Sequence, residues 1–346
     1  MVQPKAKNFI PRDATNIIKG VAIVLMFVHH FFTFPKWHVA GAEFPTLFKL
    51  APYFSEPLKI CVAIFAFLTG YFYFFSKQKN LKYSIKKSTD VYLSYAIYYL
   101  LLLLPILLFG ISLTGKQISL GFLVLDPTVM VFGWYVAFYI LSIFLLPLYD
   151  RLSKKASVAI FLITLLLPQI TTLICTTILG GKYQILNEAN LLLTWFPCVA
   201  GGYLVAKHNL FQQFSDLIKT KNKLLRCLIA LVAMVLAAAV RLVTRHFDFA
   251  SAALFIWAIL EIYNCIDHKK LLIPLSLLGK YSLQMWFLHG IFFNICKPYT
   301  QGFLFFTDKP ILVTLWGLLI CFVAAFILDF PVKLLTRAKN KLLRLE

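Results

Sequence analysis

The sequence predicts an all-α membrane protein, a polytopic bundle of about ten transmembrane helices with both termini in the cytoplasm. Three observations predict this class. The 346 residues are 60% hydrophobic and only 14% charged, with a mean hydropathy of +0.81, whereas soluble proteins carry about 25% charged residues. Apolar runs long enough to cross a bilayer recur along the chain. Lys and Arg are concentrated in alternate connections between these runs.

Ten apolar runs reach the length of a membrane span, because a helix rises about 1.5 Å per residue through about 30 Å of hydrocarbon. The first is too long for the apolar region of a signal peptide and has no small-residue cleavage site behind it, so we expect it to stay in the mature chain. Without an internal repeat or a soluble segment larger than a loop, the chain is predicted to form a single domain over residues 1–346. The runs lie near residues 16–34, 58–75, 91–111, 131–148, 157–175, 191–206, 224–243, 250–266, 277–296 and 311–330.

The positive charges predict the direction of the spans. Of the 34 Lys and Arg residues, 25 fall on the side of the two termini and nine on the other side. Because cytoplasmic loops carry an excess of Lys and Arg, both termini are predicted to be cytoplasmic. The formal net charge of +20 is then a topology signal, and we expect no nucleic-acid partner. The seven cysteines are scattered without a Cys-x-x-Cys pair, as is typical of packing residues.

Ionisable side chains at membrane depth are costly and are functional candidates by default. Few exist in this sequence, and histidine is prominent among them. Its unperturbed pKa of about 6.5 suits proton abstraction from a hydroxyl near pH 7. The candidates are His29 and His30 in the first span, Arg241 near the outer end of the seventh, Glu261 near the middle of the eighth, His289 in the ninth and Asp329 at the inner end of the tenth.

Depth arithmetic places two of these histidines at one level. His30 lies thirteen residues past Ile17, roughly 20 Å from the cytoplasmic end, and His289 lies twelve residues past Leu277, roughly 18 Å from the same end. The two side chains could therefore face a shared cavity, although periodicity alone does not show that they do. His29 points about 100° away from His30 around the helix and is expected to contact a neighbouring span.

The remaining ionisable groups leave several arrangements open. Glu261 and Arg241 could pair with one another, pair with a histidine, or line a water path. Asp329 lies close to the interface, so we expect it to be solvated or paired with Lys333.

Five ordered segments resemble the integral-membrane acyltransferase-3 family. Asn16 to His30 is similar to that family's first span, in which a Lys/Arg-Gly pair precedes the catalytic histidine by ten residues, as Gly20 precedes His30. The other four are Phe65-Ala-Phe-Leu-Thr-Gly-Tyr71, Gly133-Trp-Tyr-Val-Ala-Phe138, Trp195-Phe-Pro-Cys-Val-Ala-Gly-Gly-Tyr203 and Leu278-Gly-Lys-Tyr-Ser-Leu-Gln-Met-Trp-Phe-Leu-His289. Thr69 stands where the family usually has Ser.

The resemblance implies an O-acyltransferase of the cell (cytoplasmic or inner) membrane, in a bacterium. It would move an acyl group, with acetyl the expected one, from cytoplasmic acyl-CoA to a hydroxyl of a cell-surface or lipid-linked glycan, without a metal. His30 would act as general base or take the acyl group itself, with His29, Glu261 or His289 orienting or polarising it. Trp134, Tyr281 and Ser282 are the implied substrate-binding residues. Polysaccharide-synthesis machinery is the implied protein partner.

The donor entrance departs from the family pattern. The family often has an Arg-x-Arg pair at the cytoplasmic entrance of the third span, whereas this chain has Lys86 and Lys87 at the end of a predicted 76–90 loop. Lysines attract the phosphates of coenzyme A as point charges but lack the bidentate geometry of arginine. Lys86 and Lys87 are therefore either the donor site or plain topology signals.

Two other classes of function compete with the acyltransferase. A proton-coupled transporter or flippase of a lipid-linked sugar would use the same spans with the histidines as proton relays. Transporters often show inverted repeats, and none is visible in this sequence. A non-catalytic membrane partner in a polysaccharide-synthesis complex is the third alternative.

Overall fold

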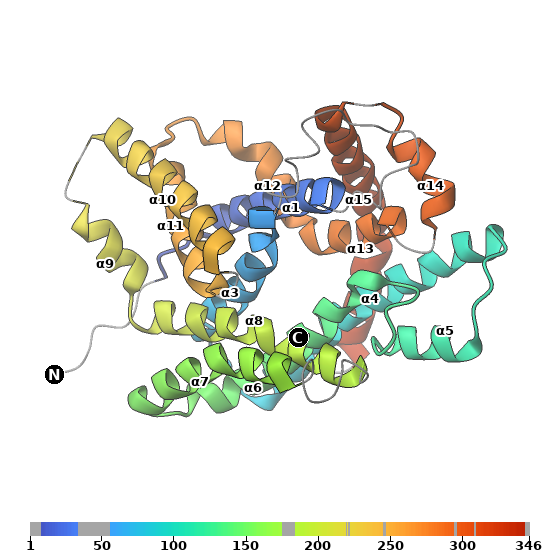
Figure 1. Cartoon of the computed structure of the whole chain (residues 1–346), viewed down its shortest axis with the longest axis horizontal. Helices are drawn as coiled ribbons and strands as arrows, with labels where there is room; N and C mark the ends of the chain where they lie inside the picture. Colours follow the sequence, from blue (N-terminus) through green and yellow to red (C-terminus); the bar gives the residue numbers. More distant parts are fainter. Residues whose placement is uncertain are drawn as a thin grey trace. The chain divides into compact units, whose positions relative to one another are not determined.

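The structure is a computed structural model that describes residues 8–33, 56–174, 184–218, 220, 222–244, 247–293, 296–307 and 309–342. Within these ranges the ordered elements are α-helices and short 3₁₀ turns (Figure 1). This confirms the predicted all-α class.

Helices occupy all ten positions at which the sequence predicts a span. Among the described residues, seven helices are long and apolar enough to cross a membrane. The ninth predicted span is instead a pair of helices bent by 61°. The ten positions hold α1 (Arg12–Thr33), α3 (Ile60–Phe74), α4 (Leu81–Leu108), α6 (Trp134–Asp150), α7 (Lys154–Leu173), α8 (Gln184–Lys207), α10 (Lys223–Thr244), α11 (Asp248–Cys265), the bent pair α12 (Ile273–Lys280) and α13 (Ser282–Phe293), and α15 (Pro310–Leu342).

The remaining helices are short and were not predicted as spans. They are α5 (Gly115–Phe122), α9 (Leu210–Leu217) and α14 (Lys297–Leu304), with 3₁₀ turns η2 (Glu56–Lys59), η3 (Val131–Gly133) and η5 (Lys269–Leu272). The number of spans stays a prediction. Helices α7 and α8 fill predicted positions but are not among the seven helices long and apolar enough to cross a membrane. Both also adjoin residues outside the described ranges.

The predicted 76–90 loop is wrong in its second half. Helix α4 begins at Leu81, ten residues before the predicted start of the third span at 91. Its first turns carry Lys82, Lys86 and Lys87. Counting apolar residues finds only the part of a helix that sits in hydrocarbon, so a helix that continues into the polar region is cut short by that method.

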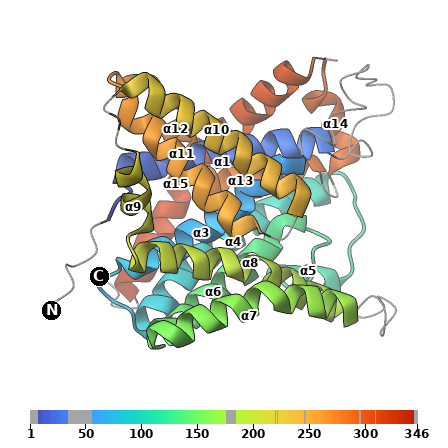
Figure 2. The ribbon, with the colours of Figure 1, turned by 60° about the vertical axis from the view of Figure 1, so that its left-hand side comes forward.

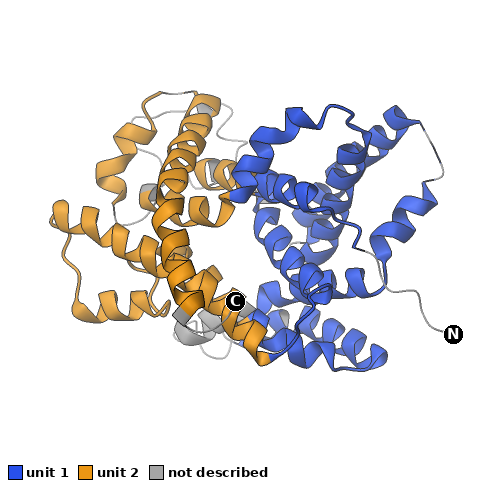
Figure 3. Ribbon diagram, turned by 180° about the vertical axis from the view of Figure 1, so that it is seen from behind, with its two compact units in different colours: residues 1–22, 57–80, 142–280 blue, residues 23–56, 81–141, 281–346 orange. Residues whose placement is uncertain are grey.

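The chain divides into two compact units, shown in different colours in Figure 3. Unit 1 comprises Met1–Ala22, Pro57–Asn80 and Ser142–Lys280, and unit 2 comprises Ile23–Glu56, Leu81–Leu141 and Tyr281–Glu346. In unit 1 the main helix contacts are α3 with α8, α10 with α11, and α7 with α8, and Figure 2 shows the last two pairs side by side. In unit 2, α13 packs on α4, α14 and α15. The single domain over residues 1–346 stays a prediction.

Two helix pairs in unit 1 approach so closely that only glycine fits between them. A Cβ added at Gly20 of α1 would lie 1.9 Å from the carbonyl oxygen of Leu275, and one at Gly279 of α12 would lie 1.7 Å from that of Asn16. The same closeness joins α3 to α8, where a Cβ at Gly70 would lie 1.8 Å from the carbonyl oxygen of Val199. Small residues are what allow membrane helices to pack backbone to backbone.

Charged helix ends meet within each unit in the way that the predicted topology requires. In unit 1 the Lys79 ammonium, beyond the end of α3, lies 2.9 Å from the Asp150 carboxylate at the end of α6. The Tyr203 hydroxyl of α8 donates to the same carboxylate at 2.5 Å. In unit 2, Lys339 near the end of α15 pairs with Asp90 of α4. These contacts agree with the predicted direction of the spans, while the side that faces the cytoplasm stays a prediction.

The outward faces of several helices are apolar, as expected of surfaces in contact with lipid. On α10, Val235 and Val243 are 70% and 85% exposed. On α15, Ile311 and Phe330 are each 74% exposed. A soluble protein would have to cover such surface, whereas lipid chains solvate it.

We predict that Gly279→Ala destabilises the protein, because the added methyl group would collide with the backbone of α1. Overpacking of this kind costs about 1–3 kcal/mol. The melting temperature of purified protein measures the effect. Gly302→Ala in α14 is the matched control, since a Cβ there has open space around it. Equal melting temperatures for the two variants would contradict the close packing.

Cysteine labelling tests the predicted topology. A cysteine placed at Lys116 in α5 should react with a membrane-impermeant maleimide from outside the cell, and one placed at Lys82 in α4 should not. The wild type supplies the background, because the described native cysteines are free thiols. Labelling at position 82 alone would reverse the orientation.

Candidate active site: two buried histidines in contact

The two histidines that depth arithmetic places at one level touch each other in unit 2. Nε2 of His289, on α13, lies 2.9 Å from Nδ1 of His30, on α1. The ring centroids are 4.9 Å apart and the ring planes differ by only 4°. The nitrogen–nitrogen distance is that of a hydrogen bond between two nearly parallel rings. His289 is fully buried and His30 is 9% exposed.

Phe132, in the turn η3, covers both imidazoles. Its ring centroid lies 4.6 Å from that of His30 and 4.3 Å from that of His289, at angles of 29° and 25°. The carbonyl oxygen of Phe132 accepts a hydrogen bond of 3.1 Å from the indole nitrogen of Trp286. A side chain on α13 thus fixes the turn that carries the stacked ring. The phenyl face also keeps water from one side of the imidazole pair.

Small and aromatic neighbours complete the surroundings of the pair. Gly290 follows His289, and a Cβ there would lie 3.2 Å from the ring of Phe132. Phe27, one turn before His30, has its centroid 5.7 Å from that of His289. His29 is 2% exposed, with its ring centroid 5.3 Å from that of His30. His30 is therefore flanked by two histidines, of which His289 shares a hydrogen bond with it.

The three implied substrate-binding residues lie beside the elements that carry the pair. Trp134 is the first residue of α6, directly after η3, and is half-buried with its ring 5.9 Å from that of Tyr135. Tyr281 and Ser282 lie at the bend between α12 and α13 and are both buried. The Tyr281 ring packs against Phe322 of α15, 5.6 Å away. Their role in substrate binding stays a prediction.

Glu261 belongs to unit 1 and has its own partners there. Its fully buried carboxylate forms an ion pair with Arg226 of α10 and accepts a hydrogen bond of 2.5 Å from Ser215 of α9. The Ser215 hydroxyl in turn accepts from the indole nitrogen of Trp257 at 3.0 Å. Glu261 lies four residues before the end of α11, so its predicted place near the middle of this helix is wrong.

The other two ionisable candidates are also paired. Arg241 is 3% exposed, and its Nε lies 3.2 Å from the carboxylate of Asp248 at the start of α11. Of the arrangements that the sequence leaves open, Glu261 with Arg241 is therefore not the one formed. Asp329 pairs with Lys333 at 2.5 Å. This confirms the expectation of a pair with Lys333.

The lysines of the proposed donor entrance lie on the second turn of α4. Lys86 is half-buried and Lys87 is exposed. The Lys87 ammonium lies 5.9 Å from the ring centroid of Tyr83. These positions leave the Lys87 charge accessible from the surface of unit 2, as a site for a phosphate requires.

Sequence reasoning missed Phe132 and Trp286. Phe132 stacks on both imidazoles, and Trp286 donates a hydrogen bond to the Phe132 carbonyl oxygen. Both are aromatic residues in apolar stretches, and such residues do not stand out in a membrane protein. One signal was available, because Phe132 directly precedes the Gly133-Trp134 motif. A second was that Trp286 lies one helical turn before His289.

Fold and site together define a class. The protein is a polytopic helical membrane protein with a hydrogen-bonded pair of buried histidines, which are the side chains best suited to proton transfer near neutral pH. The chain matches a family model described as "Acyltransferase domain" over residues 12–330. It therefore belongs to the acyltransferase-3 family of membrane acyltransferases, as its motifs predicted. Searches of curated proteins and of solved structures found no match.

The contacts of Glu261 predict a structural effect of Glu261→Gln. Replacing the carboxylate leaves the Arg226 guanidinium without its counter-ion in a partly desolvated place, which destabilises a fold. We expect a lower melting temperature and an unchanged turnover per folded molecule.

Lys223→Gln is the matched control for this variant, because it removes another ion pair of α10, that of Lys223 with Asp267 beyond the end of α11, whose side chains are 57% and 71% exposed. Exposed pairs contribute little to stability, so its melting temperature should stay that of the wild type. If Glu261→Gln lost turnover while keeping its melting temperature, Glu261 would be catalytic.

Proposed function

We propose that this membrane acyltransferase moves an acyl group, with acetyl the expected one, from cytoplasmic acyl-CoA to a hydroxyl of a cell-surface or lipid-linked glycan. The observation that carries the proposal is the 2.9 Å contact between His30 and His289. Family membership supplies the reaction type. The contact supports the assignment of the base.

The hydrogen bond between the two rings restricts their tautomers. For His30 to accept a proton on Nε2, its own proton must sit on Nδ1 and be donated to Nε2 of His289. His289 then carries its proton on Nδ1. In this arrangement His289 fixes both the orientation and the tautomer of His30, as a buried acceptor does for the histidine of a serine protease.

The reaction follows from that tautomer. Nε2 of His30 removes the proton of the acceptor hydroxyl while the hydroxyl oxygen attacks the thioester carbonyl carbon. The carbon–sulfur bond then breaks, the new ester forms, and the coenzyme A sulfur leaves with the proton from His30. The imidazole returns to its starting state. In a second version of this step, His30 takes the acyl group itself before passing it to the hydroxyl.

Lys86 and Lys87 are the proposed contacts for the phosphates of the donor. An exposed lysine such as Lys87 on the first turns of α4 can meet a nucleotide at the membrane surface. The long, thin pantetheine arm would then carry the thioester between helices toward His30. We keep the cell membrane as the proposed location and polysaccharide-synthesis machinery as a proposed partner.

Transport of a lipid-linked sugar is the less favoured function. Family membership points to acyl transfer. The imidazole pair also has its rings stacked against Phe132, which suits a fixed base better than a chain of exchanging proton carriers.

The direct test of the proposal uses purified protein in lipid nanodiscs with radiolabelled acetyl-CoA. Wild type should release free coenzyme A and transfer label to water or to added glycan. His30→Ala should lose at least about a hundredfold of this turnover, the lower bound for removal of a general base. Melting temperature and monodispersity confirm that the variant is folded. A folded His30→Ala protein with wild-type turnover would overturn the proposal.

Variants of His289 test its role as the acceptor for His30. His289→Gln keeps an oxygen that can accept from Nδ1 of His30, whereas His289→Phe fills the space without an acceptor. We expect turnover in the order wild type, Gln variant, Phe variant, with little change in the KM for acetyl-CoA. Equal loss in the Gln and Phe variants would contradict the role of His289 as the acceptor, and wild-type turnover in both would show that it only fills space.

A further inference from the structure

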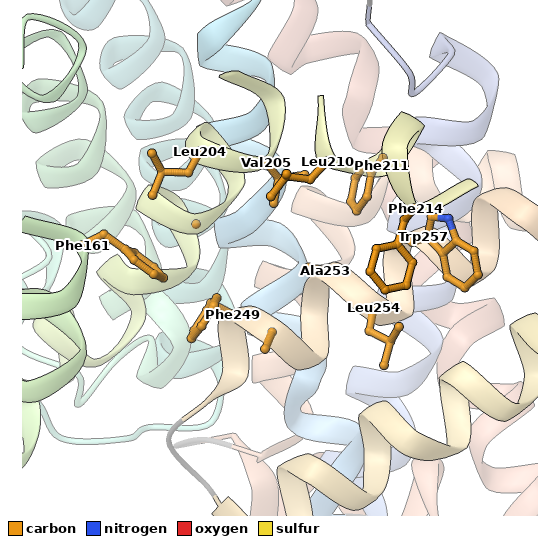
Figure 4. Close-up of a pocket in the computed structure, with 12 residues that line it drawn as sticks. Phe161, Leu204, Val205, Leu210, Phe211, Phe214, Phe249, Ala253, Leu254 and Trp257 are labelled. Atoms are coloured by element: carbon orange, nitrogen blue, oxygen red, sulfur yellow. The ribbon is translucent and has the colours of Figure 1, made fainter. Parts of the chain in front are cut away.

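Unit 1 contains an apolar cavity of about 370 Å³ that the proposed reaction does not use. Helices α7, α8, α9 and α11 line it, as Figure 4 shows. It runs between two aromatic pairs. Phe161 and Phe249 form one, with centroids 4.9 Å apart, and Phe214 and Trp257 form the other, at 5.5 Å. Its volume lies within the range of about 300–1,000 Å³ typical of small-ligand sites.

The lining of the cavity selects for hydrocarbon. Among its lining side chains the single polar atom is the indole nitrogen of Trp257, and this nitrogen already donates to Ser215. A sugar or a nucleotide would therefore lose its hydrogen bonds to water on entry and gain none. An alkyl chain loses no hydrogen bond on entry and gains close van der Waals contact with the lining side chains.

Helix α9 covers the cavity and is held in place at two points. Phe211 of α9 is buried, with its ring centroid 5.7 Å from that of Tyr71 on α3. Ser215, one turn later, donates to Glu261 of α11. Between these anchors α9 turns Phe214 into the cavity, while Leu217 at its end is 72% exposed. Helix α9 is thus buried at Phe211 and exposed at Leu217.

A cluster of positive charge lies next to one end of the cavity. Leu204 and Val205 line the cavity from the last turn of α8, which ends at Lys207. Burial, together with the nearby charges of Lys154 and Lys207, lowers the pKa of His208. Lys154 is the first residue of α7, which packs on α8, and Lys207 is the last residue of α8. Both charges act on His208, and a phosphate there would be attracted to both.

We propose that this cavity binds one acyl chain of an anionic phospholipid, whose phosphate sits on Lys154 and Lys207. The two parts of the site match the two parts of the molecule. The apolar cavity takes the chain, and the ammonium groups of Lys154 and Lys207 take the negative headgroup. Bound in this way, the lipid would bridge α7, α8, α9 and α11 within unit 1.

The test measures lipid binding by native mass spectrometry on delipidated full-length protein. The probes are dioleoylphosphatidylglycerol, which is anionic, and dioleoylphosphatidylcholine, which is zwitterionic. The wild type should retain one phosphatidylglycerol and bind it more tightly than phosphatidylcholine. Equal affinity for the two lipids would overturn the role of the lysines.

Filling the cavity tests the chain site. Ala253→Phe should weaken phosphatidylglycerol binding at least about tenfold, because the added ring occupies the space of the chain. Ala250→Leu is a milder second variant, should the first not fold. Val235→Phe, on the 70% exposed face of α10, is the matched control and should bind as the wild type does. Unchanged binding in both cavity variants would mean that the lipid sits elsewhere.

Removing charge tests the headgroup site. Lys154→Gln with Lys207→Gln should reduce the affinity for phosphatidylglycerol to that for phosphatidylcholine. The control is Lys77→Gln with Lys82→Gln, two exposed lysines outside the cluster, and it should keep the preference. A double variant that kept its preference for phosphatidylglycerol would overturn the headgroup site.

Discussion

The hydrogen bond between His30 and His289 is the interaction on which the site depends. An imidazole inside a membrane span has no water to bond with, and an unsatisfied polar group there is costly. A hydrogen bond of 2.9 Å between two nearly parallel imidazoles gives each ring a polar partner. The arrangement requires α1 and α13 to keep one register in unit 2. Phe132, held through its carbonyl oxygen by Trp286, covers the pair.

The motifs of the chain divide into those that pack helices and those that carry chemistry. Gly20, Gly70 and Gly279 each lie where a side chain would strike a neighbouring backbone. His30 and His289 each follow one of these glycines by ten residues. The short sequence segments that mark the family thus combine a close helix contact in unit 1 with a reactive side chain in unit 2.

Sequence reasoning reached the levels of the two histidines but not their contact. Counting residues along a helix gives depth, whereas the direction that a side chain faces depends on the packing of other helices. The same limit explains Glu261, whose partner Arg226 lies on another helix, in the first turn of α10. Phe132 was missed because one phenylalanine among many carries no signal of its own. The bend at Tyr281 also went unpredicted.

A double-mutant cycle on His30 and His289 tests most directly whether the two side chains act as one unit. The turnover of acetyl-CoA would be measured for the wild type, His30→Ala, His289→Ala and the double variant, each shown to be folded. If His289 acts only through His30, removing it from His30→Ala should cost no further activity. Losses that multiply in the double variant would contradict the account, because each histidine would then contribute independently.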